Sequence, residues 1–344
     1  MDELKTIIFR TDRIGDFLIS CPFILSYLKK YKKSEIVIIS SEYNYQYIKN
    51  FEFIKNVISL KNETKFLPKI LILIKMIIIL RKNKYFNVIV LDGKKRSFFI
   101  SLFLKGNKSI LLQSKGLEFL SKLFKYKNVI NYELQNQFKN FSFLSSLLDF
   151  NINHKEINIY NNYIFTKKFK LDKKYILIHL DEKWYSKYYY RDFTDINPNK
   201  EDLKVFIKNI QKILNDKFDV VITTGSKKID TIEQYTSDFT TIEDNILIKK
   251  EDNNSVIFYK NTTFNNLEYL IKNSSLLICC EGGVSHVSHN FNIKTIAFFQ
   301  KNRLQHTKFW TGHMENVNLY ERAKMKEIIN DNNFYHLIKE NLPN

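Results

Sequence analysis

Short runs of β-branched and apolar residues alternate along the chain with longer stretches in which apolar residues recur at helical spacing. This alternation is typical of βα units built around a parallel sheet. In the first half of the chain the pattern predicts a series of strands separated by helices. The expected strands cover residues 6–10, 35–40, 56–60, 87–91 and 108–112, and the expected helices follow residue 17, span 65–82 and span 138–150.

Two of these helices have features of their own. Pro22 falls inside the apolar pattern of the first helix and should bend it near its start. The stretch 65–82 is apolar almost all round, which predicts burial on most faces. Its most apolar part, 70–80, is about half as long as a membrane-spanning segment and contains Lys75. The sequence therefore predicts a buried helix here.

The periodicity fades in an Asn-, Lys- and Tyr-rich stretch, 151–170, and a second βα series follows. Its expected strands cover 175–179, 219–223, 275–279 and 294–299, and its expected helices cover 200–215, 263–272 and 284–291. We therefore expect two α/β domains with parallel sheets, 1–160 and 161–320. Residues 321–344 are expected to form a C-terminal helix, and packing back on the N-terminal domain is one option for it.

Two successive α/β domains of similar size are expected to leave a cleft between them. In open parallel sheets, ligands bind beyond the carboxyl ends of the strands. The residues that carry chemistry should therefore lie in the strand-to-helix loops.

Composition narrows the class of protein. The chain has 344 residues, 44% of them hydrophobic, which is enough for a core and excludes a disordered chain. The net charge of +18 suggests an anionic partner. However, the excess is mostly Lys in a chain rich in Ile and Asn, which an AT-rich coding sequence would also produce. The basic residues are spread along the chain without a nucleic-acid-binding motif, so a nucleic-acid-binding protein is the weaker alternative.

Several classes of site and compartment are disfavoured. Three cysteines cannot form a disulfide framework, so a reducing compartment is expected. The N-terminal residues do not have the pattern of a secretory signal, and neither GxGxxG nor a P-loop is present. His286 and His289 lie near Cys279 and Cys280, but adjacent strand cysteines point to opposite faces. We expect no metal site and no cofactor.

The first informative loop reads RTDRIGDF, residues 10–17. Gly15 permits a tight turn, and Asp16 lies at a helix start, where the helix dipole favours its ionised form. One interpretation is that Asp16 only caps the helix, while Arg10 and Arg13 are solvated or paired with Asp12. The other is that the carboxylate takes a proton from an acceptor hydroxyl as a general base.

The second loop reads CCEGGVSHVSH, residues 279–289. Gly282 and Gly283 lie where the next helix should begin, and exposed N–H groups at a helix N-terminus suit a diphosphate. Glu281 would then face what the phosphates carry, and His286 could donate to a phosphate oxygen. A glycine-rich turn with a helix-capping Ser285 and a core histidine is the alternative.

Other loops add weaker candidates. LDEKWYSKYYYR, residues 180–191, contributes Lys183, Lys187 and Arg191, which could hold a diphosphate or be ordinary surface residues. After the next strand, Thr223, Thr224 and Gly225 offer a further backbone donor site. In the first half, LDGKKR supplies Asp92, Gly93 and Arg96.

In order and spacing these loops resemble the glycosyltransferase family 9 heptosyltransferases, which build the inner core of lipopolysaccharide. The resemblance depends on RTDRIGD followed by a helix with Pro22, on LDGKKR, and on EGGVSHVSH followed by the strand KTIAFF. It implies a GT-B fold, in which two Rossmann-like domains with parallel sheets face each other across a cleft. It also implies an enzyme that transfers a sugar with inversion and without a metal.

The resemblance assigns roles to the candidate residues. Asp16 would be the catalytic base. The implied acceptor-binding residues are Arg10, Arg13, Gly15, Asp92 and Arg96. The implied donor-binding residues are Lys183 or Lys187, Thr223, Thr224, Gly225, Glu281, Gly282, Gly283, Val284, Ser285 and His286.

Two departures from the family concern the donor site. Heptosyltransferases usually carry Asp where this chain has Glu281, and many have a Glu after the VITTGS-like turn where this chain has Lys227 and Lys228, with Asp230 as the nearest acid. The resemblance implies ADP-heptose as the donor, and the two departures leave another nucleotide sugar or a catalytically inactive GT-B scaffold as alternatives.

The expected partners follow from the resemblance and the charge. They are a nucleotide sugar and an anionic glycolipid acceptor, either a lipid A–core precursor or another surface glycan, with no nucleic acid. A basic face could also hold the enzyme on anionic lipids. The expected location is cytoplasmic, peripheral on the inner face of the inner membrane.

Overall fold

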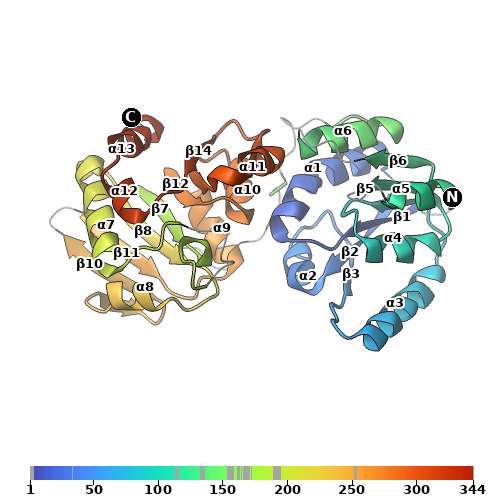
Figure 1. Ribbon diagram of the computed structural model, residues 1–344, viewed down its shortest axis with the longest axis horizontal. Helices are drawn as coiled ribbons and strands as arrows, with labels where there is room; N and C mark the ends of the chain where they lie inside the picture. Colours follow the sequence, from blue (N-terminus) through green and yellow to red (C-terminus); the bar gives the residue numbers. More distant parts are fainter. Residues whose placement is uncertain are drawn as a thin grey trace. The chain divides into compact units, whose positions relative to one another are not determined.

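A computed structural model describes residues 4–32, 34–112, 116–131, 136–152, 159–160, 163, 165, 171, 173–188, 195–251 and 254–343. The chain divides into two compact units, Met1–Ile164 and Phe165–Asn344 (Figure 1). Among the described residues, no helix is both long enough and apolar enough to cross a bilayer.

The first unit is an open sheet of parallel strands with helices on both faces (Figure 1). Its strands lie in the order β3-β2-β1-β4-β5-β6. They are β1 (Leu4–Arg10), β2 (Ser34–Ser41), β3 (Asn56–Leu60), β4 (Asn87–Val90), β5 (Asn107–Leu112) and β6 (Asn128–Asn131). The helices are α1 (Ile14–Lys30), α2 (Glu42–Ile48), α3 (Phe66–Arg81), α4 (Lys95–Leu102), α5 (Gly116–Leu123) and α6 (Gln137–Leu147).

Alternation along the strands divides the core of the first unit. Ile7 and Phe9 of β1 pack in one cluster with residues of α3, α4 and α5, so these helices cover one face. Helices α1, α2 and α6 meet elsewhere through aromatic contacts, such as Phe17 with Tyr47 and Phe23 with Phe141. Helix α1 continues through Pro22.

The second unit is a larger sheet in the order β14-β13-β12-β7-β8-β11-β10-β9. Its strands are β7 (Tyr175–Leu180), β8 (Asp219–Thr224), β9 (Thr240–Glu243), β10 (Ile246–Glu251), β11 (Asn254–Tyr259), β12 (Leu276–Cys280), β13 (Thr295–Phe299) and β14 (Val317–Glu321). The helices are η1 (Glu182–Trp184), α7 (Lys200–Leu214), α8 (Asp230–Tyr235), α9 (Phe264–Lys272), α10 (Gly283–Asn290), η2 (Lys301–Arg303), α11 (Leu304–Thr311), α12 (Met325–Ile329) and α13 (Asn332–Asn341).

The parallel part of this sheet repeats the strand order of the first unit. Strands β11, β8, β7, β12, β13 and β14 are its third, second, first, fourth, fifth and sixth parallel strands, and β10 pairs antiparallel with both β11 and β9. Ile176 and Ile178 of β7 are fully buried, as expected for a strand covered on both faces. The α/β fold with two Rossmann-like parallel sheets is thus confirmed.

The C-terminal segment differs from the single helix that the sequence predicts. Residues from 321 onward complete β14 and then form α12 and α13. Phe334 of α13 is buried against Phe206 of α7 and Phe298 of β13, with ring centroids 5.8 and 5.6 Å apart. The apolar face of α13 therefore joins the core of the second unit, and 321–344 is not a separate part.

Helix α3 also differs from the prediction of burial on most faces. Only Met76 and Leu80 are buried, and they pack on the sheet. Leu67 and Leu71 are 71% and 66% exposed. An apolar sequence alone does not show whether a neighbouring element covers the second face of a helix.

Candidate active site

In each unit the candidate residues gather where the strand order reverses. In the first unit this point lies between β1 and β4, and in the second between β7 and β12. Ligands of doubly wound sheets bind at the carboxyl ends of these strands. The loops after β1, β4, β7 and β12 contain most of the residues predicted from the sequence.

Asp16 lies in the first turn of α1, directly after the loop that follows β1. One oxygen of its carboxylate accepts a hydrogen bond from the Arg13 N–H at 3.0 Å, which is a helix-capping contact. The Asp16 side chain is 20% exposed. The carboxylate therefore caps the helix and also keeps an accessible face, so the two interpretations of Asp16 do not exclude each other.

Arg10 fixes the position of Asp16 and is itself fully buried. Its Nε donates to the Asp16 carbonyl at 2.7 Å, and its Nη1 donates to the Leu91 carbonyl at 3.0 Å. The expected role of Arg10 in contacting an acceptor is therefore wrong, because no part of its side chain is accessible. Arg13 is exposed and Gly15 is buried.

The expected role of Asp92 in binding an acceptor is also wrong. Its carboxylate is fully buried and accepts hydrogen bonds from the Thr11 N–H, the Thr11 hydroxyl and the Ser97 hydroxyl, at 3.1, 2.6 and 2.7 Å. It joins the loop after β1 to the start of α4, so it positions the loop and does not face an acceptor. Arg96 donates to the Thr11 carbonyl at 3.0 Å and is partly exposed.

Lys94 completes this loop network and was not singled out from the sequence. Its Nζ also donates to the Thr11 carbonyl, at 3.0 Å. The β1 loop is thus held by side chains from the β4 loop, a long-range pairing that local sequence patterns do not show.

Asp12 is an acid that sequence reasoning treated only as a partner of Arg10. Its Oδ2 lies 3.3 Å from the Arg10 Nη1, while its Oδ1 is buried without a hydrogen-bond partner among the described residues. Burial raises the pKa of Asp12 to about 7. The positive charge of Arg10 lowers this pKa, and the negative charge of Asp16 raises it further. A carboxyl group that titrates near neutral pH therefore lies beside the candidate base.

In the second unit, α10 begins at the double glycine. Gly282 has a φ of 151°, which favours glycine, and its N–H pairs with the Ser285 hydroxyl at 3.0 Å. Within the described part of the chain, the Gly283 and Val284 N–H groups in the first helical turn have no acceptor. These two donors and the helix dipole form a potential anion site.

Lys183 reaches this helix terminus from another element. It lies in η1, whose first turn is capped by Asp181, and its Nζ donates to the Glu281 carbonyl at 2.5 Å. A Cβ at Gly282 would collide with the same Nζ. The absence of a side chain at Gly282 thus lets the ammonium group lie against the start of α10, and the binding of a diphosphate by these residues stays a prediction.

Lys187 does not share this position. Its Nζ donates to Asp230 at 3.0 Å, and the same carboxylate oxygen accepts from the Tyr188 hydroxyl at 2.8 Å. All of these groups lie at the start of α8. Of the two lysines, Lys183 is therefore the one beside the double glycine. Arg191 lies outside the described residues.

The expected role of Thr223 in binding the donor is also wrong. The residue is fully buried, and its hydroxyl pairs with the His179 Nδ1 at 3.0 Å. It is paired in the sheet with both β7 and β11, so it offers no donor to a ligand. Thr224 and Gly225 are partly exposed at the end of β8. A Cβ at Gly225 would approach the Glu182 carboxylate to 2.8 Å, so this turn packs against η1.

The remaining candidates of the second loop are mostly internal. Ser285 is fully buried, and its hydroxyl donates to the Gly282 carbonyl at 2.9 Å, so its side chain closes the turn and the expected donor contact by that side chain is wrong. Val284 is buried, and only its N–H is available. His286 is 6% exposed, with its ring 6.3 Å from that of His313. Its contact with a phosphate stays a prediction. Glu281 is partly exposed.

Arg322 was missed from the sequence. It follows β14, is 4% exposed, and none of its three guanidinium nitrogens has a hydrogen-bond partner in the described structure. Burial raises the pKa of Asp181, and the charges of Lys183 and Arg322 oppose this rise. Burial also raises the pKa of Cys280 to about 12, with Arg322 the largest opposing charge. The guanidinium therefore lies near the carboxyl ends of β7 and β12.

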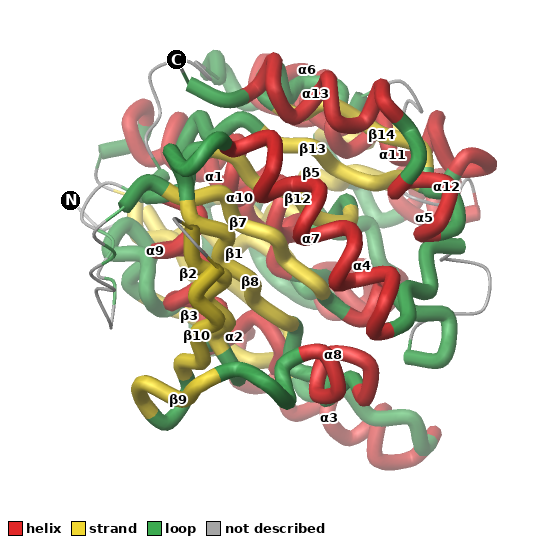
Figure 2. The backbone as a smooth tube through the Cα atoms, turned by 90° about the vertical axis from the view of Figure 1, so that its left-hand side faces the viewer, coloured by secondary structure: helices red, strands yellow, loops and turns green. Residues whose placement is uncertain are grey.

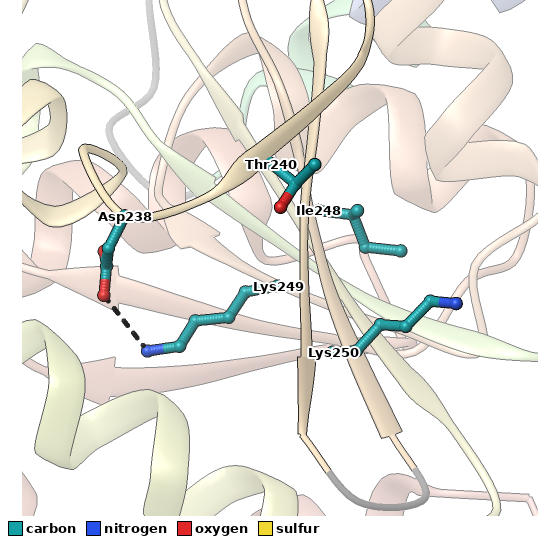
Figure 3. Close-up of a pocket in the computed structure, with 5 residues that line it drawn as sticks. All are labelled: Asp238, Thr240, Ile248, Lys249 and Lys250. Carbon is teal, nitrogen blue, oxygen red and sulfur yellow. Dashed lines mark hydrogen bonds and ion pairs between the residues drawn. The ribbon is translucent and has the colours of Figure 1, made fainter.

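Among the described residues, no group of three or more His, Cys, Asp or Glu side chains is arranged to hold a metal ion. A surface pocket is lined by Asp238, Thr240, Ile248, Lys249 and Lys250, with the Lys249 Nζ 3.4 Å from the Asp238 carboxylate (Figure 3). Strands β8, β11 and β10 separate β7 from β9, so this pocket lies away from the strand reversal.

No protein-family model and no curated protein sequence matches this chain. Solved structures do. Escherichia coli heptosyltransferase WaaC with ADP-2-deoxy-2-fluoro heptose matches with a TM-score of 0.69 at 12% identity, over 98% of each chain. E. coli ADP-heptose LPS heptosyltransferase II matches with a TM-score of 0.64 at 10% identity, also over 98% of each chain. A family 9 glycosyltransferase from Veillonella parvula matches with a TM-score of 0.60 at 12% identity, over 93% of this chain and 86% of its own.

The chain has the GT-B fold. At these identities the likeness shows the fold and leaves the activity to be argued from this chain's own residues. The similarity covers nearly the whole chain, so both units correspond to parts of the heptosyltransferase structures.

Proposed function

We propose that this protein is a glycosyltransferase that moves a sugar from a nucleoside diphosphate to a hydroxyl group of a glycan acceptor. The observation that carries the proposal is the cation at the start of α10. Lys183, from the loop after β7, contacts the Glu281 carbonyl next to a double glycine whose following N–H groups lack acceptors. This arrangement offers positive charge and backbone donors to a diphosphate.

On this proposal the second unit holds the donor. The N–H groups of Gly283 and Val284 donate to phosphate oxygens, and the Lys183 ammonium balances the charge that grows when the sugar leaves. Arg322 is a further cation for the same anion, because its buried guanidinium otherwise has no hydrogen-bond partner in the described structure. Burying an unpaired charge is costly, so an anionic ligand supplies the missing interaction.

Asp16 is the proposed base. Its carboxylate takes the proton of the acceptor hydroxyl, the freed oxygen forms a bond to the anomeric carbon, and the bond from that carbon to the diphosphate breaks. One displacement of this kind inverts the anomeric configuration. Because Lys183, Arg322 and the α10 dipole carry the positive charge, the proposed reaction uses no divalent cation.

The finer identity of the substrates is also proposed. ADP-heptose is the proposed donor, since heptosyltransferases of E. coli share this fold and are described with ADP-heptose or ADP. The proposed acceptor is a lipopolysaccharide core precursor or a related surface glycan, which places the enzyme at the cytoplasmic face of a membrane. Glu281, which replaces the family's usual Asp, is the residue where a different sugar would be accommodated.

A thermal-shift panel tests the donor class directly. The full chain is heated with ADP, GDP, UDP and their sugar conjugates, and ADP-heptose is expected to raise the unfolding midpoint most, because a ligand that binds only the folded state stabilises it. Preferential stabilisation by a UDP- or GDP-sugar would replace ADP-heptose as the donor and keep the glycosyltransferase.

Transfer itself needs a second measurement. The assay measures the nucleoside diphosphate that is released when the nucleotide sugar is hydrolysed or its sugar is transferred. It is carried out with and without EDTA. Tight binding without release in the presence of a core oligosaccharide acceptor would indicate an inactive scaffold. Failure of every nucleotide to stabilise the second unit would overturn the proposed function.

A further inference from the structure

Helices α3, α4 and α5 form a surface that the proposed reaction does not use. They lie one above another on the same face of the first sheet (Figures 1 and 2), and α3 packs against α4. Each turns apolar side chains outward as well as inward. We call the outward side the α3–α5 face, and its large exposed apolar residues are Phe66, Leu67, Ile70, Leu71, Ile74, Ile78, Ile79, Phe99, Phe103, Phe119, Leu123 and Phe124.

The spacing of these residues shows an organised surface. On α3, Leu67, Leu71, Ile74 and Ile78 recur at helical spacing and are 71%, 66%, 48% and 58% exposed. Phe119 and Leu123 repeat the four-residue spacing on α5, and Phe99 of α4 lies four residues before Phe103, which directly follows that helix. Contiguous exposed apolar patches on monomeric soluble proteins often mark interaction sites, and this group of large exposed apolar side chains on neighbouring helices suggests one.

The segment that contains these three helices is strongly basic. Residues 61–131, which contain the three helices, have 16 Lys and Arg against 3 Asp and Glu, so they carry +13 of the chain's +18. Asp92 is buried in the loop network, and Glu118 is paired with Lys122 at 2.9 Å. On α3 itself, Lys69 and Lys75 are exposed among the apolar residues.

We propose that the α3–α5 face binds the surface of an anionic lipid bilayer, with its apolar stripes among the acyl chains and its lysines at the headgroups. A helix of 16 residues is about 24 Å long, which suits one lying in the interface plane. A second copy of this chain is a poorer occupant, because a two-fold contact would bring like-charged faces together. Nucleic acid is also poorer, since the outer stripe of α3 is mainly aliphatic and gives bases little to stack on.

Binding of this face to a bilayer does not depend on glycosyl transfer, and only its purpose, holding the enzyme at a lipid-linked acceptor, rests on the proposed function. The experiment uses the full chain without nucleotide, so its outcome is independent of glycosyl transfer. Flotation with phosphatidylcholine vesicles, with and without a third of phosphatidylglycerol, measures binding at low and high salt.

The variant Leu67→Ser, Leu71→Ser and Ile78→Ser removes apolar groups from the face. Its control is Phe143→Ser, Val205→Ser and Ile242→Ser, at side chains of similar exposure on α6, α7 and β9. We expect the first variant to lose about 100-fold or more in affinity for the anionic vesicles and the control to bind like the wild type. Replacing Lys65, Lys69 and Lys75 by Gln should weaken binding to anionic vesicles about fivefold for each lysine at low salt. Matching circular dichroism and unfolding midpoints verify that all variants are folded.

Equal binding by the two serine variants would overturn the proposal, and so would a wild type that ignores anionic vesicles. Sedimentation velocity identifies the other occupants. A dimer that the face variant dissociates, in a protein that does not float with vesicles, would make this face a contact between copies. Binding to single-stranded RNA in place of vesicles would assign it to nucleic acid.

Discussion

At Asp16 a single carboxylate both caps a helix and faces solvent, and substitutions can separate the two roles. Asp16→Ala removes both, whereas Asp16→Asn keeps an oxygen that accepts the Arg13 N–H but cannot take a proton. We expect both variants to lose about 100- to 10,000-fold in turnover while ADP binds normally. Only the alanine variant should lose about 1 kcal/mol of stability. Steady-state kinetics and urea unfolding measure these effects, and normal turnover in the asparagine variant would exclude Asp16 as the base.

Lys183 and Lys187 provide a matched pair for the diphosphate site. Lys183 contacts the start of α10, and Lys187 is held by Asp230. Lys183→Met should weaken ADP binding roughly 10- to 100-fold, because a charge-assisted contact to phosphate is lost. Lys187→Met should leave the affinity within about twofold, since exposed ion pairs contribute little. Isothermal titration calorimetry decides between them, and a larger effect at Lys187 would contradict the assignment.

Arg322 should show opposite effects on stability and binding. Its guanidinium is buried and, among the described residues, without a hydrogen-bond partner, so Arg322→Met removes a buried cation whose donors are unsatisfied. We expect the free protein to unfold at higher urea concentration and ADP to bind more weakly, with AMP affected less. A variant that is destabilised and binds ADP normally would give Arg322 a structural role only.

At the scale of elements, we expect the contact between His179 of β7 and Thr223 of β8 to make the second unit sensitive to acid. Burial lowers the pKa of His179 to about 4, so the folded state binds fewer protons than the unfolded state between this value and 6.5. The contribution of neutral His179 to stability is complete above pH 6.5 and is lost as the pH falls toward 4. It amounts to about 3 kcal/mol.

His179→Gln tests this dependence. The variant should lose less stability than the wild type between pH 7 and pH 4.5, because glutamine does not titrate. Urea unfolding at the two pH values measures the difference by tryptophan fluorescence. An identical loss in both proteins would show that His179 does not set the acid sensitivity.

The sequence predicted most of the long helices and central strands, but it did not predict how far each element is buried. The apolar runs of β1, β7 and β12 follow from composition, because a central parallel strand is buried on both faces. Strands β6, β9, β10, β11 and β14 were missed. Strands β6, β9 and β14 are edge strands and β10 carries two lysines and a glutamate, whereas β11 is largely buried and its apolar run was overlooked. Helix α3 was identified as a helix and wrongly predicted as buried, because the same apolar pattern suits a core and an exposed binding face.

At the scale of the whole molecule, both tryptophans lie in the second unit, at Trp184 and Trp310. Fluorescence therefore reports on the unit that contains the proposed donor site. ADP at 100 times its dissociation constant should stabilise this unit by about 2.7 kcal/mol. We expect the fluorescence-detected transition to move to higher urea and the far-UV circular dichroism to resolve a second transition that ADP does not move. A single transition shifted equally in both signals would mean that the two units unfold together.

The sequence by itself determined the order of the main βα units and which strand-to-helix loops carry the candidate residues. These are local properties. They depend on the hydrophobic periodicity, on the positive φ that glycine permits at position 282 and on a carboxylate at the start of a helix. The tertiary structure alone decided which loop residues are accessible. Arg10, Asp92 and Thr223 have the right chemistry for ligands, but partners distant in sequence bury them. Lys183 and Arg322 lie near each other's strands only in the folded sheet, so the sequence alone did not show that both are close to the carboxyl ends of β7 and β12. Burial and pairing depend on what surrounds a residue in space.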